Sequence, residues 1–522
     1  MVNLRKYFPP NSIFQHKTSC CSWYRVKENI LLLLTQLVSL IFLIGTLYGI
    51  LGNDVLPGTE IFALLLLAIS AYGGGVLAGL IRLPPLVGML VVGILYRNLS
   101  FIPYQKNISI MWASTLREIS LVVILLKAGL ALDPKKLKEM KLDVFKLSFI
   151  PCLFEAATSA VFIHFLLDLP WLWAFMLGFI LCAVSAAVLV PGMLVLEQKG
   201  LGTESGIPTL VMASLSVDNV VALTGFVVTF STITSDESLI WTLVKRPVEL
   251  IIGLTLGALI GLLLWYLPSR NSDSKSSILY YRSLMLILGG LGLNFLCKRF
   301  GMTGAGALGC VGLAFVAALW WRNDVQLFKN ITSVTGIFWS LIEAFLFGLI
   351  GSEVTIESLG NNIGYSLLVL VLGGIIRYLS TMFALFGSKL SIKEKAFVSA
   401  TWLAKATVQA AVGSQALDYA RTENKNVQFV EYSKQVLTMS VLSIIVTAPL
   451  GAIFIEHLAP ILLTESGNST DTSQNSFEIF EDERECIAEV TVTDYGSSNN
   501  LTNSRKFDGL IKGLKSNANA LQ

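Results

Sequence analysis

Long apolar runs separated by short polar loops occupy most of the chain. A helix needs about 20 apolar residues to cross a hydrocarbon core about 30 Å thick. Runs of this kind predict an all-α polytopic membrane protein with about fourteen transmembrane helices. The expected spans are residues 29–51, 59–80, 84–97, 108–132, 142–167, 170–196, 207–232, 240–267, 278–297, 304–321, 334–353, 364–388, 393–417 and 434–462.

The two ends of the chain lack this apolar pattern. Residues 1–28 are polar and basic, and the run that follows has no small-residue cleavage site, which indicates a retained anchor. The last stretch is acidic and rich in Ser, Asn and Thr, which predicts disorder. We therefore expect a cytoplasmic N-terminal segment (1–28), a transmembrane antiporter-like domain (29–463) and a disordered acidic cytoplasmic tail (464–522).

Basic residues in short loops indicate the orientation, because positive loops stay on the cytoplasmic side. With the N-terminus inside, the lysine cluster of 135–141 is cytoplasmic, and the loops 52–58, 233–239 and 354–363, without lysine or arginine, face out. Three outward loops disagree, since they carry Arg97 and Lys106, Lys298 and Arg299, and Arg421 and Lys425. The plasma membrane is the first expectation, with an intracellular or mitochondrial membrane as alternatives.

Composition agrees with a chain that lies mostly in lipid, since 54% of its residues are hydrophobic and 14% are charged, against about 25% charged in soluble domains. The net charge of +3 is spread over short loops, which argues against binding to nucleic acid. The three histidines and seven cysteines have no spacing typical of a metal cluster or a disulfide framework. No nucleophile with its base is evident, so we expect neither an enzyme nor a cofactor.

Four ionisable residues lie deep within expected spans. They are Glu155, Asp218, Arg377 and Lys405. A charge at mid-bilayer costs roughly 2.5–3.5 kcal/mol on insertion scales, so such residues indicate function. Two acids and two bases can pair, which makes burial tolerable. A second set of charges favours a structural role instead: Arg117, Glu118, Lys127, Glu343 and Glu353.

Helix-breaking or polar residues interrupt two expected spans. The span 170–196 contains Pro191 and Gly192, which weaken helical hydrogen bonding, and the span 393–417 has Lys405 among small and polar residues. Broken helices in transporters point freed backbone groups at an ion. The two spans lie an odd number of spans apart, which predicts inverted repeats with two crossing broken helices. A pair of ordinary proline- and glycine-containing helices is the alternative.

Three strings carry a family resemblance: Leu346–Val354, Trp402–Ala411 and the stretch from Gly206 through Asp218 to Phe226. They resemble the NHA branch of the monovalent cation/proton antiporter superfamily, the sodium/hydrogen exchanger-like domain proteins of animals. The resemblance covers 132–463, and more loosely the chain from residue 30. It implies a homodimer with a dimerisation domain and a mobile core domain that rocks around a central site. Na+ or Li+ would exchange for protons.

The resemblance also implies roles for individual residues. Asp218 matches the first acid of the family's aspartate pair, and Ser185 matches the polar residue of the first broken helix. Lys405 matches the lysine of the second broken helix. Arg377 matches the base that faces the site, and Glu155 matches the acid that partners this base. These matches predict a buried Glu155–Arg377 charge pair close to Asp218.

Two positions depart from the family pattern. Asn219 follows Asp218 where the family commonly has a second aspartate, and Ala186 follows Ser185 where it commonly has proline. We expect Asp218 to carry both substrates. Oxygens of Asn219, Ser185 and Thr224 would then serve as neutral ligands, which suits a hard monovalent cation in transit.

Two other functions stay open at this stage. If Glu155 pairs with Arg377 while Lys405 stays charged, the site is net positive and favours an anion such as chloride, moved with a proton. The second alternative is a transport-weak subunit that regulates an active relative. The expected partners are therefore the transported ions, membrane lipid and a second copy of the chain.

Overall fold

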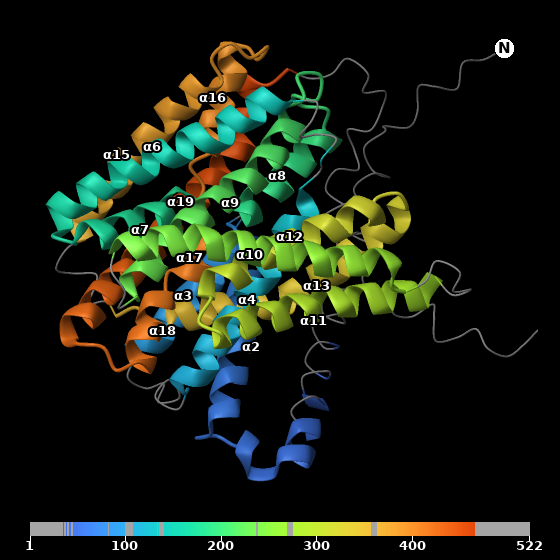
Figure 1. Ribbon diagram of the computed structural model, residues 1–522, viewed down its shortest axis with the longest axis vertical. Helices are drawn as coiled ribbons and strands as arrows, with labels where there is room; N and C mark the ends of the chain where they lie inside the picture. The colour runs from blue at the N-terminus through green and yellow to red at the C-terminus, as the bar shows by residue number, and fades with distance from the viewer. Residues whose placement is uncertain are drawn as a thin grey trace, which may run out of the picture. The chain divides into compact units, whose positions relative to one another are not determined.

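The computed structural model describes residues 35, 38, 41–42, 45–81, 83–99, 108–132, 134, 140–235, 239–268, 275–355 and 363–464. The regular elements within these residues are helices (Figure 1). They are η1 (Gly52–Val55), α2 (Glu60–Leu80), α3 (Pro85–Asn98), α4 (Ile110–Ala131), α6 (Lys141–Leu167), α7 (Trp171–Cys182), α8 (Ala186–Gln198), α9 (Ile207–Ile233), α10 (Leu239–Tyr266), α11 (Lys275–Arg299), α12 (Thr303–Trp321), α13 (Val325–Gly351), α15 (Ile363–Ala384), α16 (Ile392–Thr401), α17 (Thr407–Val412), α18 (Gln415–Thr422) and α19 (Val427–Leu462).

The apolar helices confirm the predicted class, an all-α polytopic membrane protein. Within the described residues, 10 helical stretches are long and apolar enough to span a membrane, with α7 and α8 together forming one of them. The shorter α3 coincides with an expected short span. Most of the expected span 29–51 lies outside the described residues, so the total of about fourteen stays a prediction. The segment 1–28 and nearly all of the tail 464–522 also lie outside them.

The helices pack as two groups. The scaffold helices are α2, α3, α4, α10, α11, α12 and α13, in which α10 packs against α12 and α13 packs against α3 and α4. The core helices are α6, α7, α8, α9, α15, α16, α17, α18 and α19, in which α6 packs against α7, α9 and α15. Contacts between the groups run mainly from α4, α10 and α12 to α9, α17 and α18.

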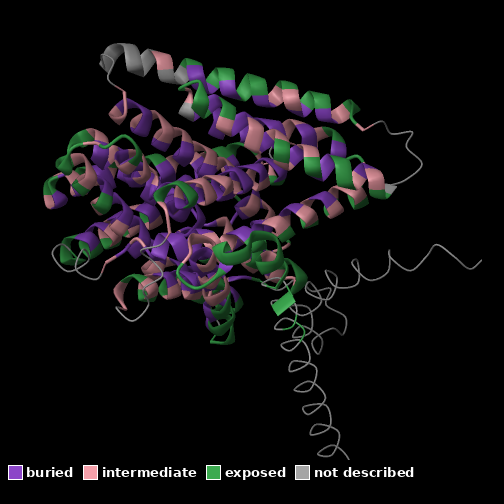
Figure 2. Ribbon diagram, turned by 90° about the horizontal axis from the view of Figure 1, so that it is seen from below, coloured by how far each residue is buried: buried purple, intermediate pink, exposed green. Residues whose placement is uncertain are grey.

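Burial follows the pattern expected of a protein in lipid. Buried residues gather in the interior of the bundle, whereas the outer helices carry exposed positions along their length (Figure 2). The exposed side chains include large apolar ones, such as Ile251, Leu259 and Phe383. Many large apolar side chains exposed on the outer helices suit contact with lipid rather than water.

Two interrupted helices cross within the core helices. The first runs from α7 to α8 and is non-helical at 183–185, and the second runs from α16 to α17 and is non-helical at 402–406. The Ser185 N–H donates to the carbonyl of Ala404 at 2.8 Å, so the two interruptions meet. The predicted pair of crossing broken helices is therefore present.

The position of the first interruption differs from the prediction. Pro191 and Gly192 lie inside α8, which continues through them to Gln198. Gly192 is instead a packing residue, since a Cβ added there would lie 2.8 Å from the side chain of Ile455 in α19. A proline removes one hydrogen bond but does not always end a membrane helix. The helix opens several residues earlier because distant segments satisfy its backbone there.

Candidate functional site

The end of α7 presents carbonyl groups to side chains from two other elements. The Gln409 Nε2 group donates to the carbonyls of Ile180 and Ala183, each at 2.8 Å. The Arg377 Nη1 group donates to the carbonyl of Cys182 at 2.7 Å. The C-terminal end of a helix carries partial negative charge, so a guanidinium group and an amide donor stabilise it.

The interruption before α8 presents N–H groups to a carboxylate and to the second broken helix. The Val184 N–H donates to Asp218 Oδ2 at 3.2 Å, next to the Ser185–Ala404 hydrogen bond. The N-terminal end of a helix favours negative charge. The first broken helix therefore has a base at the end of α7 and an acid at the beginning of α8.

Glu155 of α6, Asp218 of α9, Arg377 of α15 and Lys405 of the second interruption form one connected charge cluster. Arg377 Nη2 lies 2.7 Å from Asp218 Oδ1, and Arg377 Nη1 lies 3.1 Å from Glu155 Oε2. Lys405 Nζ lies 2.7 Å from Glu155 Oε2. The side chains are 0–4% exposed. Burial is tolerable because two acids face two bases, so their formal charges cancel.

The charge cluster contains the predicted Glu155–Arg377 contact and adds two contacts that the sequence did not specify. Arg377 is shared between Glu155 and Asp218, and Glu155 is shared between Arg377 and Lys405. Lys405 is therefore not an isolated positive charge. The net-positive site that the anion alternative requires does not arise from these four residues.

Asn219 follows Asp218 in the chain, and Ser185 follows Val184, whose N–H donates to the Asp218 carboxylate. Asn219 and Ser185 are both buried. Their side-chain oxygens, Oγ of Ser185 and Oδ1 of Asn219, have no hydrogen-bond partner among the described residues. Buried polar atoms are usually satisfied, so two unpartnered oxygens on segments that carry or contact the Asp218 carboxylate fit a role as ligands.

Thr224, the remaining predicted ligand, is not brought to the charge cluster. Its hydroxyl donates to the carbonyl of Val220 on its own helix at 2.7 Å. It borders a small apolar cavity together with Leu125 of α4 and Val311 of α12. Six residues along a helix correspond to about 9 Å, so Thr224 lies well away from Asp218. The role of Thr224 as a ligand therefore stays a prediction, because the hydroxyl oxygen can still coordinate a cation while its proton bonds to Val220.

Gln409 is a site residue that the sequence analysis did not assign. It is fully buried in the short helix α17, and its amide joins that helix to the end of α7. Its Oε1 atom has no partner within the described part of the chain. The signal was present in the sequence, since an uncharged amide within an apolar span is itself unusual.

A second group of ionised side chains, the bridging cluster, links the scaffold and core helices. Arg117 of α4 contacts Asp418 of α18 through two hydrogen bonds, one of them from Nε to Oδ2 at 3.0 Å. Arg421 of α18 binds both carboxylate oxygens of Glu353, which follows α13, at 2.9 Å each. Arg117 also lies 3.7 Å from Glu353. Bidentate arginine–carboxylate pairs are among the stronger ion pairs.

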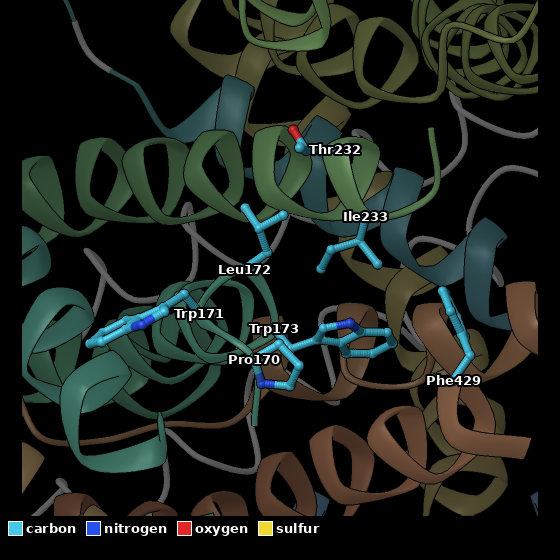
Figure 3. Close-up of a pocket in the computed structure, with 7 residues that line it drawn as sticks. All are labelled: Pro170, Trp171, Leu172, Trp173, Thr232, Ile233 and Phe429. Carbon is cyan, nitrogen blue, oxygen red and sulfur yellow. The ribbon is translucent and has the colours of Figure 1, made fainter. Parts of the chain in front are cut away.

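An open cavity of about 380 Å³ lies where α7, α9 and α19 approach one another (Figure 3). Its lining is largely apolar and aromatic: Pro170, Trp171, Leu172, Trp173, Thr232, Ile233 and Phe429. Aromatic residues of this kind are typical of the membrane–water interface. The lining includes no member of the charge cluster, so we do not assign this cavity as the ion site.

The fold and the buried charges define a class, the membrane transporters built on crossing broken helices. The structure of the sodium proton antiporter MjNhaP1 from Methanocaldococcus jannaschii at pH 8 is similar, with a TM-score of 0.60 at 20% identity. The match covers 77% of this chain and 98% of that chain. A likeness at this identity shows the shared fold.

Sequence comparison identifies the family. The family model for the transmembrane sodium/hydrogen exchanger matches residues 64–460. Sodium/hydrogen exchanger 9B2 of Xenopus tropicalis is 40% identical over 457 residues, which are 85% of this chain and 83% of that protein. Sodium/hydrogen exchanger 9B1 of Homo sapiens is 39% identical over 425 residues, 80% of this chain and 81% of that protein. The chain belongs to the sodium/hydrogen exchanger family, within the monovalent cation/proton antiporter superfamily.

Removal of the central base should destabilise the protein strongly. Arg377→Leu leaves Asp218 without its basic partner, and breaking a buried pair in this way costs about 3–5 kcal/mol. The control is Lys298→Met, because the Lys298 side chain is 53% exposed in its pair with Glu118 and exposed pairs contribute about 0–1 kcal/mol. Unfolding temperatures in detergent measure both changes. Equal effects of the two substitutions would contradict the charge cluster.

Proposed function

We propose that this chain is a secondary transporter that exchanges a monovalent cation, Na+ or Li+, for protons across a membrane. The observation that carries the proposal is the Asp218 carboxylate, fully buried where the broken helices cross and bonded to Arg377. The names of the similar sodium/hydrogen exchangers support the same assignment and argue against an enzyme. The chain contributes side chains and backbone groups to the reaction, and the cation is a substrate.

Asp218 is the group for which both substrates compete. A buried carboxylate is stable only when a proton, a base or a cation offsets its charge. Arg377 Nη2 holds Oδ1 at 2.7 Å, and the Val184 N–H holds Oδ2 at 3.2 Å. A dehydrated cation competes with Arg377 for these oxygens, and so does a proton. Because the carboxylate accommodates one substrate at a time, transport takes the form of exchange.

Glu155 allows Arg377 to release Asp218 without becoming an unpaired charge. Arg377 Nη1 stays 3.1 Å from Glu155 Oε2, and Lys405 holds the same carboxylate oxygen at 2.7 Å. An unpaired buried charge would cost several kcal/mol. Glu155 therefore lowers the barrier to substrate binding, although it does not bind the substrate.

Neutral oxygens complete the coordination of the cation. The Ser185 Oγ and Asn219 Oδ1 atoms are buried and lack partners among the described residues, and each adjoins a residue that contacts or carries the Asp218 carboxylate. Hard monovalent cations prefer oxygen ligands. A site with one carboxylate and neutral oxygens favours a cation over chloride, because the charge cluster has no excess positive charge.

The family resemblance implies a dimerisation domain and a mobile core domain, and we assign the scaffold helices to the first and the core helices to the second. The bridging cluster crosses this boundary, since Arg117 lies in α4 and Asp418 lies in α18. Relative movement must therefore break or rearrange these ion pairs. The bridging cluster therefore stabilises this conformation, and a transport cycle has to break its ion pairs.

Asp218→Asn should abolish proton-coupled cation flux, because asparagine has no titratable proton at the carrier position. Folding should be retained, since the amide oxygen still accepts one of the two hydrogen bonds that Asp218 accepts and Arg377 keeps its contact with Glu155. The measurement is Na+ or Li+ flux in liposomes with an imposed pH gradient. Asp324→Asn is the control, because Asp324 caps α13 through a bond to the Leu327 N–H, and asparagine caps equally well. Full flux through correctly inserted Asp218→Asn protein would overturn the mechanism.

Asn219→Asp should strengthen coupling to Na+ or Li+. A second carboxylate beside Asp218 adds negative charge, and the two acids bind protons as a coupled unit. We expect a shifted pH optimum and a changed voltage dependence, measured as flux against pH at two clamped membrane potentials. An anion transporter would instead lose chloride flux. Curves identical to those of the wild type would mean that residue 219 lies off the ion path.

A further inference from the structure

Cys152 of α6 and Cys182 of α7 form a buried thiol pair next to the charge cluster. Their Sγ atoms lie 3.4 Å apart, and both residues are fully buried. The Cys182 thiol donates to the carbonyl of Phe179 at 3.3 Å, which leaves the Cys152 thiol to donate to the Cys182 sulfur. The proposed exchange mechanism uses neither thiol.

The backbones of α6 and α7 are held close together at this pair. A Cβ added at Gly178 would lie 2.4 Å from the carbonyl oxygen of Ala156, so only glycine allows the two helices to approach this closely. Ala156 follows Cys152 by one helical turn, and Gly178 precedes Cys182 by one turn. The two contacts therefore share one antiparallel register. A disulfide would bring the two sulfurs from 3.4 Å to about 2.05 Å, a displacement that this close helix contact must accommodate.

We propose that Cys152 and Cys182 are a modification site, a dithiol that hydrogen peroxide oxidises to a disulfide. One thiol reduces the peroxide, so that a sulfenic acid and one water form. The sulfur of the other thiol then attacks the sulfenic acid, which releases a second water and forms the S–S bond. Two thiols and one peroxide thus give one disulfide and two waters. A buried thiol is a poor nucleophile, so the reaction requires that water and peroxide reach the two cysteines.

The disulfide would act on the ion site through the end of α7. The carbonyl of Cys182 accepts the 2.7 Å hydrogen bond from Arg377, and Val184, two residues later, holds Asp218. Drawing the Cys182 sulfur toward α6 strains the segment that positions both groups. We expect oxidised protein to lose transport rate and apparent cation affinity. This effect on transport rests on the proposed cation exchange, whereas formation of the bond does not.

The test uses the full chain in liposomes. Samples are treated with hydrogen peroxide, the remaining thiols are blocked with N-ethylmaleimide, and digested peptides are analysed by mass spectrometry. We expect a linked peptide that contains Cys152 and Cys182 and a loss of Na+ flux. Dithiothreitol should cleave the link and restore the flux. Methionine sulfoxide in the same digest shows that the oxidant acted.

Matched variants separate this pair from the other thiols. Cys152→Ser keeps a hydrogen-bonding group against Cys182 but cannot form the bridge, so its flux should resist peroxide, and Cys152→Ala provides a second variant without the thiol. Cys297→Ser removes a buried cysteine of α11 and should stay sensitive.

Three results would overturn the proposal. The first is the lack of a linked peptide in oxidised wild type. The second is a Cys152→Ser protein as sensitive as wild type, and the third is a linked peptide without loss of flux. Failure of the cation-exchange proposal can be told apart from failure of the disulfide proposal, because untreated wild type would then show no proton-coupled flux.

Discussion

The guanidinium group of Arg377 is the contact on which the site depends. It binds Asp218 and Glu155 and also donates to the last carbonyl of α7. The Arg377 side chain is 0% exposed. Unpaired charges and unsatisfied carbonyls are costly in such surroundings. The burial of Asp218 and the need for Glu155 both depend on this one group, whereas the broken helices are also joined by the Ser185–Ala404 hydrogen bond and by Gln409. Lys405 then offsets the second acid and keeps the cluster neutral.

This arrangement connects stability with transport. In the proposed mechanism, the ion pairs that stabilise the buried charges are the contacts that a bound cation or proton replaces. Gln409 bonds the end of α7 to α17 independently of Arg377, so the proposed change of partners by Arg377 would leave this link in place. The bridging cluster between α4, α13 and α18 has a different position, because it joins the scaffold helices to the core helices and does not contact the substrate ligands. The proposal therefore assigns substrate exchange and movement of the core helices to separate sets of ion pairs.

The sequence was informative where the signal is local. Apolar length predicted the helices well, as in the span 170–196, which is found as α7 and α8, and charge within apolar runs identified the four members of the charge cluster. Contacts between residues far apart in the sequence could not be predicted from local patterns. Pro191 did not mark the break, because tertiary hydrogen bonds open the helix at 183–185. The hydroxyl of Thr224 bonds to its own helix, so its role as a ligand stays a prediction. The contact between Cys152 and Cys182 depends on how α6 and α7 pack, which no local pattern encodes.

The most direct test of the account is proton release on cation binding. Purified protein in weakly buffered detergent, with a pH indicator and at a pH near the midpoint of transport activity, is mixed with sodium chloride, lithium chloride or choline chloride. Competition for one carboxylate predicts that Na+ or Li+ releases protons from wild type, that choline chloride does not, and that Asp218→Asn releases none. Equal proton release from the variant, or proton uptake driven by choline chloride, would contradict the proposal that a cation and a proton compete for Asp218.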